Sequence, residues 1–149
     1  MTPTKDFVYD LHYEVLRRKT MTDKTKPTAA ELEILDVLWD RERATVGDVH
    51  RAISERRPAT YTTILKLMQI MLEKGLVRRN EKGKAHVYWP VHSRKKTRST
   101  LVTDLLDRAF QGSALKLVLH VLETEPASRE ELDEIRALIK EAEAKGAKK

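Results

Sequence analysis

The 149-residue sequence predicts a mainly α-helical protein with one small β-hairpin. Apolar residues recur at helical spacing in three segments between residues 28 and 75, and the spacing becomes that of extended strands between residues 76 and 91. Helical spacing returns in three further segments from residue 93 onward. We therefore expect one domain over residues 27–92 and a second, three-helix domain over residues 93–142.

The two ends of the chain are expected to lie outside these domains. Residues 1–26 are interpreted as a flexible N-terminal extension, because Met21 and the residues after it resemble a second start of the protein. Residues 143–149 are expected to form a disordered tail, because their Ala, Lys and Gly residues should fray.

The first two helices are each predicted to begin at a capping box, in which a Thr caps the helix and an acidic residue follows three positions later. In the first helix Thr28 is followed by Glu31, and apolar residues continue at helical spacing to about residue 40. In the second helix Thr45 is followed by Asp48. Pro58 should end this helix, because the residue before a proline is pushed out of helical geometry.

The third helix carries hydroxyl residues on its first turn, although its later residues are apolar. Thr60 is the expected N-cap, and Gly75 stands where a left-handed residue commonly ends a helix. Two strands should follow over residues 76–80 and 85–91, joined by a connection that contains Gly83. The buried side of the third helix is predicted to consist of Ile64, Leu67, Met68, Met71 and Leu72.

Three helices followed by a glycine-turned hairpin are typical of a winged helix-turn-helix. In this interpretation the second and third helices form the helix-turn-helix and the hairpin is the wing. The net charge supports a phosphate-facing surface, because residues 78–98 contain eight basic side chains and one acidic one, Glu81. The alternative is that these charges only face solvent.

The third helix has the chemistry of a DNA recognition helix. Thr can bind a phosphate or a base, Gln can pair with adenine, and Lys can reach guanine or a phosphate. Glu73 is the one acidic residue of this segment and lies at its far end. The candidate DNA-binding residues are Thr60, Tyr61, Thr62, Thr63, Lys66 and Gln69 on the helix, and Arg78, Arg79, Lys82 and Lys84 on the wing.

Other basic residues have less definite roles. Arg56 and Arg57, which precede the recognition helix, are plausible phosphate contacts. The basic residues that open the following helix could either contact the DNA backbone or face solvent. These are Arg94, Lys95, Lys96 and Arg98.

Catalysis is not expected. The sequence has no cysteine, and its five histidines lie in five separate predicted elements without the spacing of a helical metal pair. His86 and His92 could share one face, but surface polar residues are the simpler interpretation, and His120 is best explained as a core or interface residue. We expect no catalytic residue, metal site, cofactor or small-molecule substrate.

The three C-terminal helices have apolar stripes too broad for short helices to bury alone. We expect a second copy of the chain to cover them in a twofold homodimer. Packing against the winged helix is the alternative. The predicted interface residues are Leu101, Leu105, Leu106, Phe110, Leu115, Leu119, Leu122, Leu132, Ile135, Leu138 and Ile139.

Several motifs resemble those of the penicillinase-repressor family of winged-helix regulators. They are the run TAAELEIL over residues 28–35 with Leu38 and Trp39, YTTI at 61–64, and EKGLV at 73–77. The likeness covers about residues 27–140. It implies a homodimer that represses transcription by binding a palindromic DNA operator.

In the β-lactam-sensing members of that family, a membrane sensor-protease signal leads to cleavage of an Asn-Phe bond and release from DNA. The place of that bond is near Asp104 and Leu105 here, so the possible cleavage region has a different residue pair. The copper-responsive branch has a Cys-rich metal hook, which a chain without cysteine does not carry.

The sequence therefore predicts a transcriptional repressor without enzymatic activity. It also predicts a cytoplasmic protein, because no apolar run approaches the roughly 20 residues of a membrane span and residues 1–20 contain no continuous signal-peptide core. The alternative function is a winged-helix module that binds other proteins without specific DNA readout.

Overall fold

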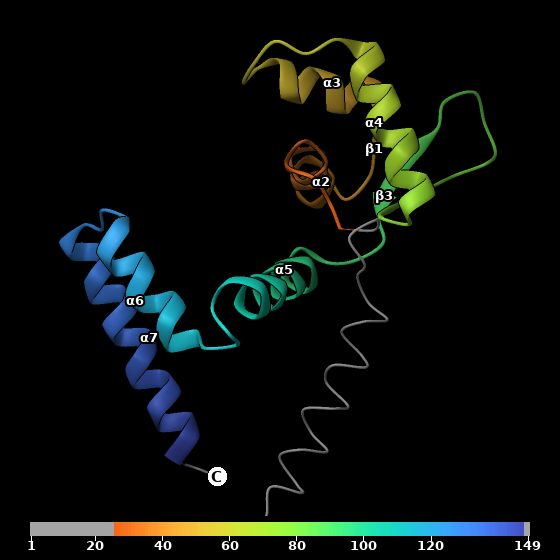
Figure 1. Cartoon of the computed structure of the whole chain (residues 1–149). Coiled ribbons are helices and arrows are strands. Elements are labelled where there is room, and N and C mark those ends of the chain that lie inside the picture. The colour runs from red at the N-terminus through yellow and green to blue at the C-terminus, as the bar shows by residue number, and fades with distance from the viewer. Residues whose placement is uncertain (1–25, 148–149) are drawn as a thin grey trace, which may run out of the picture. The chain divides into compact units, whose positions relative to one another are not determined.

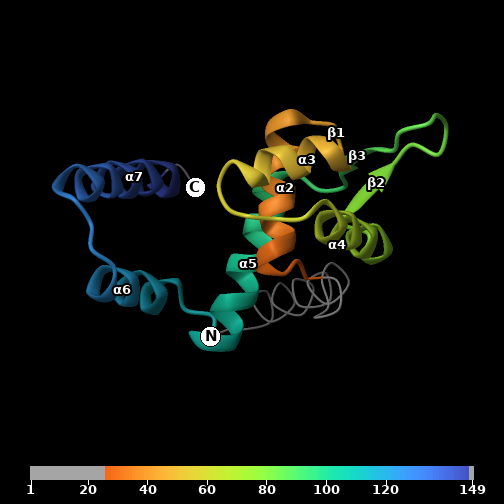
Figure 2. The same cartoon turned by 90° about the horizontal axis from the view of Figure 1, so that it is seen from above.

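The computed structural model describes residues 26–147, so all but the last residue of the expected extension over residues 1–26 lies outside the described range (Figures 1 and 2). Within that range the protein is mainly helical, with six helices and one small antiparallel sheet, as the sequence predicts. The elements are α2 (Ala29–Arg41), β1 (Ala44–Thr45), α3 (Val46–Ser54), α4 (Tyr61–Lys74), β2 (Val77–Arg79), β3 (Val87–Pro90), α5 (Arg94–Ala109), α6 (Ala114–Thr124) and α7 (Arg129–Ala147).

The predicted helix caps are confirmed. In α2 and α3, the side chains of Thr28 and Thr45 each accept a hydrogen bond from the backbone N–H of the acidic residue three positions later. The carboxylate of that acid accepts a hydrogen bond from the N–H of the cap residue. In α4, the side chain of Thr60 accepts from the Thr63 N–H. Gly75 has φ 79°, a left-handed conformation that suits glycine because it has no Cβ.

The sheet contains one more strand than the sequence predicts. Its order is β1-β3-β2, with both pairings antiparallel. The hairpin of β2 and β3 is the predicted wing, although both strands are shorter than expected. Strand β1 was missed because it has two residues, one of which is the predicted helix cap Thr45, and its pairing of Ala44 with Tyr88 joins positions far apart in the chain.

The core of the winged helix lies where α2, α3, α4 and the sheet meet (Figures 1 and 2). Ile64, Met68 and Met71 supply the contribution of α4, as predicted, whereas Leu67 and Leu72 are half-buried at its margin. Tyr88 reaches the same core from the central strand. The other large, fully enclosed side chains include Ile34, Leu38, Val49, Ile53 and Val77.

The chain divides into two compact units, one ending at Val102 and one beginning at Thr103. The predicted boundary was at residues 92 and 93. The difference arises because the first turns of α5 pack on the winged helix: Thr97 is buried, and the Arg94 guanidinium lies 2.8 Å from the Asp40 carboxylate.

The second unit has little core within the described chain. Helices α6 and α7 contain no buried residue in their described part. Helix α7 continues to Ala147, beyond the expected end at residue 142, because the alanines of the supposed tail favour the helical conformation. None of the described helices is long and apolar enough to cross a membrane.

Candidate nucleic-acid interface

The outward face of α4 includes the residues of this helix that are expected to read DNA, together with Ile70 and Glu73. Thr62, Thr63, Lys66 and Gln69 are exposed, while Ile64 and the two methionines of the same helix are buried. The helix therefore presents its polar line to solvent and its apolar stripe to the core. This exposure is what contact with bases requires, and the contact itself stays a prediction.

The hydroxyl residues at the start of α4 are ordered by hydrogen bonds. Thr60 Oγ1 accepts from the Thr63 N–H at 3.2 Å and donates to Thr63 Oγ1 at 2.8 Å. Tyr61 is 49% exposed, and its ring meets the His50 ring edge-on with 5.9 Å between centroids. His50 Nε2 donates to the carbonyl oxygen of Ala59 at 2.8 Å. The helix start is thus fastened to α3.

A cavity of about 490 Å³ lies between the start of α3, α4 and the wing. It brings together four sequence-predicted site residues from two elements: Tyr61 and Gln69 of α4, and Arg79 and Lys84 of the wing. None of the described residues that line it is acidic. The helix and the wing thus line one cavity, and its positively charged side chains, Arg79 and Lys84, come from the wing.

Two of the wing arginines have different environments. Arg78 is exposed. Arg79 is half-buried; its Nη1 donates to the Tyr88 hydroxyl at 3.2 Å, and its Nε lies 3.5 Å from the Glu81 carboxylate. The hydrogen bond to Tyr88 raises the pKa of Arg79 further. Arg79 therefore also stiffens the wing, which the sequence alone did not indicate. Lys82 and Lys84 are exposed on the connection between the strands.

Two other candidate phosphate contacts are paired with acids. Arg57 binds the Glu33 carboxylate, with 2.5 Å between Nη2 and Oε1, and Arg94 binds Asp40. Sequence reasoning missed both pairs because their members lie 24 and 54 positions apart. Lys95, Lys96 and Arg98 remain exposed on α5.

The four described histidines, which include His50, do not form a recognisable metal site. His86 is exposed and its Nδ1 lies 3.1 Å from the Asn80 carbonyl oxygen, while burial and then the nearby Lys96 ammonium lower the pKa of His92. His120 is exposed, with its ring 5.8 Å from that of Phe110. Within residues 26–147 no group of three potential ligands is placed to hold a metal ion.

The fold and this surface define a winged-helix protein with the features of a nucleic-acid-binding domain. Residues 27–141 match the family model described as the penicillinase repressor. The chain therefore belongs to the penicillinase repressor family, whose members are transcriptional repressors and not enzymes.

Similar proteins include the transcriptional regulator BlaI of Mycobacterium tuberculosis, which is 36% identical over 126 residues, covering 83% of this chain and 90% of BlaI. The penicillinase repressor of Bacillus licheniformis is 25% identical over 112 residues, or 75% of this chain and 88% of that protein. The methicillin resistance regulatory protein MecI of Mammaliicoccus sciuri is 23% identical over 120 residues, or 80% and 98%.

Proposed function

We propose that this repressor binds a palindromic DNA operator as a homodimer, with one α4 in the major groove of each half-site. The observation that carries the proposal is the outward face of α4, where Thr62, Lys66 and Gln69 are exposed and the one acidic residue of the helix, Glu73, lies at its C-terminal end. Small hydroxyl groups at a helix start can approach phosphates and thymine methyl groups, and Lys and Gln can bind base edges.

The wing is proposed to follow the flanking backbone. Arg78, Lys82 and Lys84 are exposed on it. Arg79 and Lys84 line the cavity beside α4, so their positive charges lie next to the helix. Contacts of this kind strengthen binding to any DNA sequence, so the wing supplies affinity while α4 supplies sequence preference.

Dimerisation is proposed to occur through the second unit. Leu115 is 68% exposed and Leu138 is 63% exposed, and Leu105, Leu119, Leu122 and Ile139 are exposed as well. Large apolar side chains exposed in such number on one unit favour an interface there. A twofold dimer would place two α4 helices on two half-sites about one helical turn of DNA apart, or a multiple of that.

We propose that cleavage after a membrane sensor signal ends repression, at or near Asp104 and Leu105 within α5. Leu105 is exposed, and the Asp104 carboxylate accepts a hydrogen bond from Arg108 one turn later. Proteases bind extended chains, so this part of α5 would have to unwind first. Mass spectrometry of the protein co-expressed with the sensor-protease should find fragments ending there; an intact chain released from DNA would contradict cleavage.

Footprinting on the DNA upstream of the protein's own gene tests the proposal. We expect two protected half-sites, and binding that weakens with salt at a log–log slope of about −0.9 for each neutralised phosphate. Equal affinity for random DNA would contradict operator recognition. Binding to no DNA at all would favour the winged-helix module that binds other proteins.

A further inference from the structure

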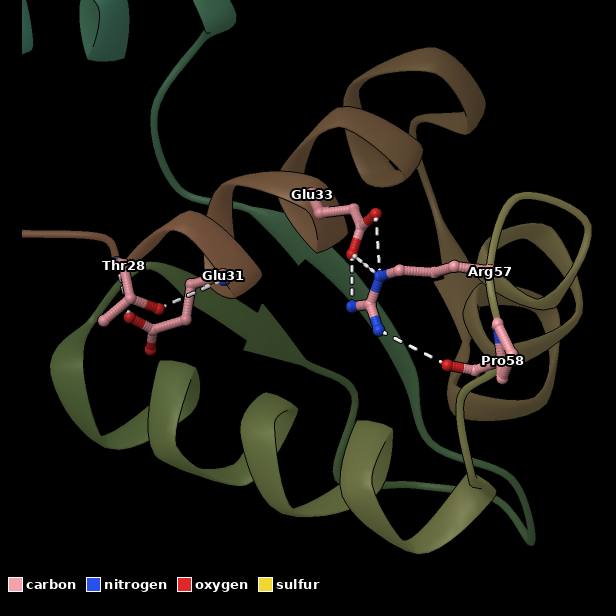
Figure 3. Close-up of polar contacts among 5 residues, drawn as sticks. All are labelled: Thr28, Glu31, Glu33, Arg57 and Pro58. Atoms are coloured by element: carbon pink, nitrogen blue, oxygen red, sulfur yellow. Dashed lines mark hydrogen bonds and ion pairs between the residues drawn. The ribbon is translucent and has the colours of Figure 1, made fainter.

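We propose that Glu31 and Glu33 of α2 are positioning residues that hold the two ends of α4 at the angle needed to read DNA. The two acids lie two residues apart near the start of α2 (Figure 3). One reaches the residue that ends α4 and the other reaches the turn that precedes α4. The inference rests on the proposed function, because it assigns these residues a role in operator recognition.

At the C-terminal end of α4, Glu31 holds Lys74. The Glu31 side chain is 1% exposed, and its Oε1 accepts from the Lys74 ammonium at 2.6 Å. Lys74 also donates to the carbonyl oxygen of Lys26 at 3.3 Å, just before α2 begins. Glu31 is itself held by the Thr28 N–H at 2.9 Å. Lys74 is the last residue of α4, so the end of the helix is fastened to the start of α2.

At the N-terminal end, Glu33 holds the turn between α3 and α4 through Arg57. The Arg57 Nη2 and Nε both donate to Glu33 Oε1, at 2.5 and 3.0 Å, and Nε also lies 3.3 Å from Oε2 (Figure 3). Arg57 Nη1 donates to the Pro58 carbonyl oxygen at 3.4 Å. Pro58 lies two residues before Thr60, the N-cap, so this fork fixes the chain where α4 starts.

These two ionic contacts fix the position of α4 along its own axis, which apolar packing does not. Burial of Ile64, Met68 and Met71 holds the helix against the core, but apolar burial is non-directional and allows small shifts along the helix axis. Charge-assisted hydrogen bonds are short and directional, above all when an Arg fork meets a carboxylate. Base contacts tolerate displacements of only about 0.5 Å. Two ionic contacts from one rigid helix therefore fix the position of α4.

The Glu33–Arg57 pair allows an effect on the position of α4 to be distinguished from an effect on folding stability. Its side chains are 24% and 47% exposed, and ion pairs so exposed contribute little to the folding equilibrium. Removing Glu33 also makes the surface more positive, which strengthens non-specific DNA binding. For Glu33→Ala, a positioning role thus predicts a lower operator affinity, whereas a purely electrostatic role predicts a higher one.

The test measures affinity for the operator and for random DNA with the full-length protein. We expect Glu33→Ala to lower operator affinity roughly fivefold, with random-DNA affinity unchanged or raised and the thermal midpoint lowered by no more than about 5 °C. Arg57→Lys should also lower operator affinity, although it keeps the charge, because Lys cannot form the fork. The double substitution Glu33→Ala/Arg57→Ala should be no worse than the more damaging single substitution to Ala.

The matched control is Asp133→Ala, which removes the acid of an exposed Asp133–Arg136 pair in α7 and should leave the ratio of the two affinities unchanged. Amide hydrogen exchange gives a second readout without DNA: the Thr63 and Ile64 amides should exchange faster in Glu33→Ala. If wild-type protein prefers its operator but Glu33→Ala keeps that preference, the positioning role is wrong. A wild-type protein without operator preference would instead refute the proposed function, and the positioning role with it.

Discussion

Large apolar side chains are buried in the first unit of the molecule and exposed in the second. In the winged helix, Ile34, Leu38 and Ile53 have no exposed surface. In α6 and α7, Leu115 and Leu138 keep about two thirds of theirs. Three helices and a sheet can enclose a core between them, whereas α6 and α7 present one apolar stripe each and have no further layer in the described chain to cover it.

This contrast separates two sources of stability. The winged helix carries its own core, so its folding should not depend on protein concentration. The second unit lacks a core of its own within the described chain, and the proposed dimer would make its stability depend on the concentration of a partner. Trp39 and Trp89 are the two tryptophans of the chain, and both lie in the first unit, so their fluorescence reports on the winged helix alone.

The largest expected effect comes from Leu105→Asp, which places a charge in the proposed interface. The dimer should dissociate, and operator affinity should fall by roughly 100-fold or more because two linked half-sites are no longer bound together. Light scattering gives the mass in solution, and a gel-shift titration gives the affinity. The tryptophan unfolding transition should stay where it is in the wild type.

Leu105→Met is the matched control, because it changes shape while keeping apolar volume. It should remain dimeric and bind the operator as the wild type does. An unchanged mass for Leu105→Asp would remove Leu105 from the interface and weaken the contrast between the two units.

Next in size is Gln69→Ala, which affects function within the first unit without touching its core. Gln69 is exposed, so the free energy of unfolding should change little. Operator affinity should fall by about 1–3 kcal/mol if Gln69 holds a base through two hydrogen bonds. Binding to random DNA should not change. An equal loss on every sequence would make Gln69 a backbone contact instead, and Lys140→Ala in α7 controls for substitution outside the winged helix.

Glu31→Gln should have the largest effect on the stability of the winged helix among these variants. The amide keeps the shape of the side chain but loses the charge that pairs with the Lys74 ammonium. Lys74 remains partly exposed, so we expect a loss of about 2 kcal/mol, less than for a fully buried pair. Urea unfolding followed by tryptophan fluorescence measures it. Glu33→Gln should cost less than about 1 kcal/mol, because its partner Arg57 is about half exposed.

Local signals in the sequence were sufficient to predict the helices and their caps. The caps at Thr28, Thr45 and Thr60 follow from residues three positions apart, and the apolar spacing predicted every described helix. Long-range pairings were beyond such reasoning. Two examples are the pairing of Ala44 with Tyr88 and the fork between Glu33 and Arg57. Both depend on how distant segments pack together, and no local sequence pattern encodes that packing.

The same limit applies to the candidate site. The exposed line of α4 could be predicted, because helical periodicity assigns each residue to one face. The cavity that joins Gln69 to Arg79 could not be predicted, because it requires the position of the wing relative to the helix. The second role of Arg79, as a donor to the Tyr88 hydroxyl, follows only from the register of β2 and β3.

Acid should weaken the winged helix in a defined pH range. Burial alone would raise the pKa of Glu31, but hydrogen bonds from Lys74 and Thr28 outweigh it and hold the pKa below its usual value of 4.5. Hydrogen bonds from Arg57 lower the pKa of Glu33 in the same way. The unfolded chain therefore binds protons more readily than the folded one, so this contribution to stability is complete above about pH 4.5 and disappears as the pH falls below it.

Urea midpoints measured by tryptophan fluorescence should accordingly be level from pH 7 to about pH 5 and fall below about pH 4.5. Glu31→Gln, which has no carboxyl group to protonate at this position, should show a shallower fall than the wild type. An identical fall in both proteins would show that Glu31 does not link protonation to folding.

The smallest effect is expected from Lys82→Ala on the wing. Lys82 is exposed on the connection between β2 and β3, and its proposed contact is one phosphate, which carries no sequence information. Binding to the operator and to random DNA should weaken by the same factor, and the salt slope should become shallower by about 0.9. Lys140→Ala in α7 removes the same charge from the second unit and should leave the slope unchanged. A change in sequence preference for Lys82→Ala would mean that the wing reads bases, and the division between a reading helix and an anchoring wing would be wrong.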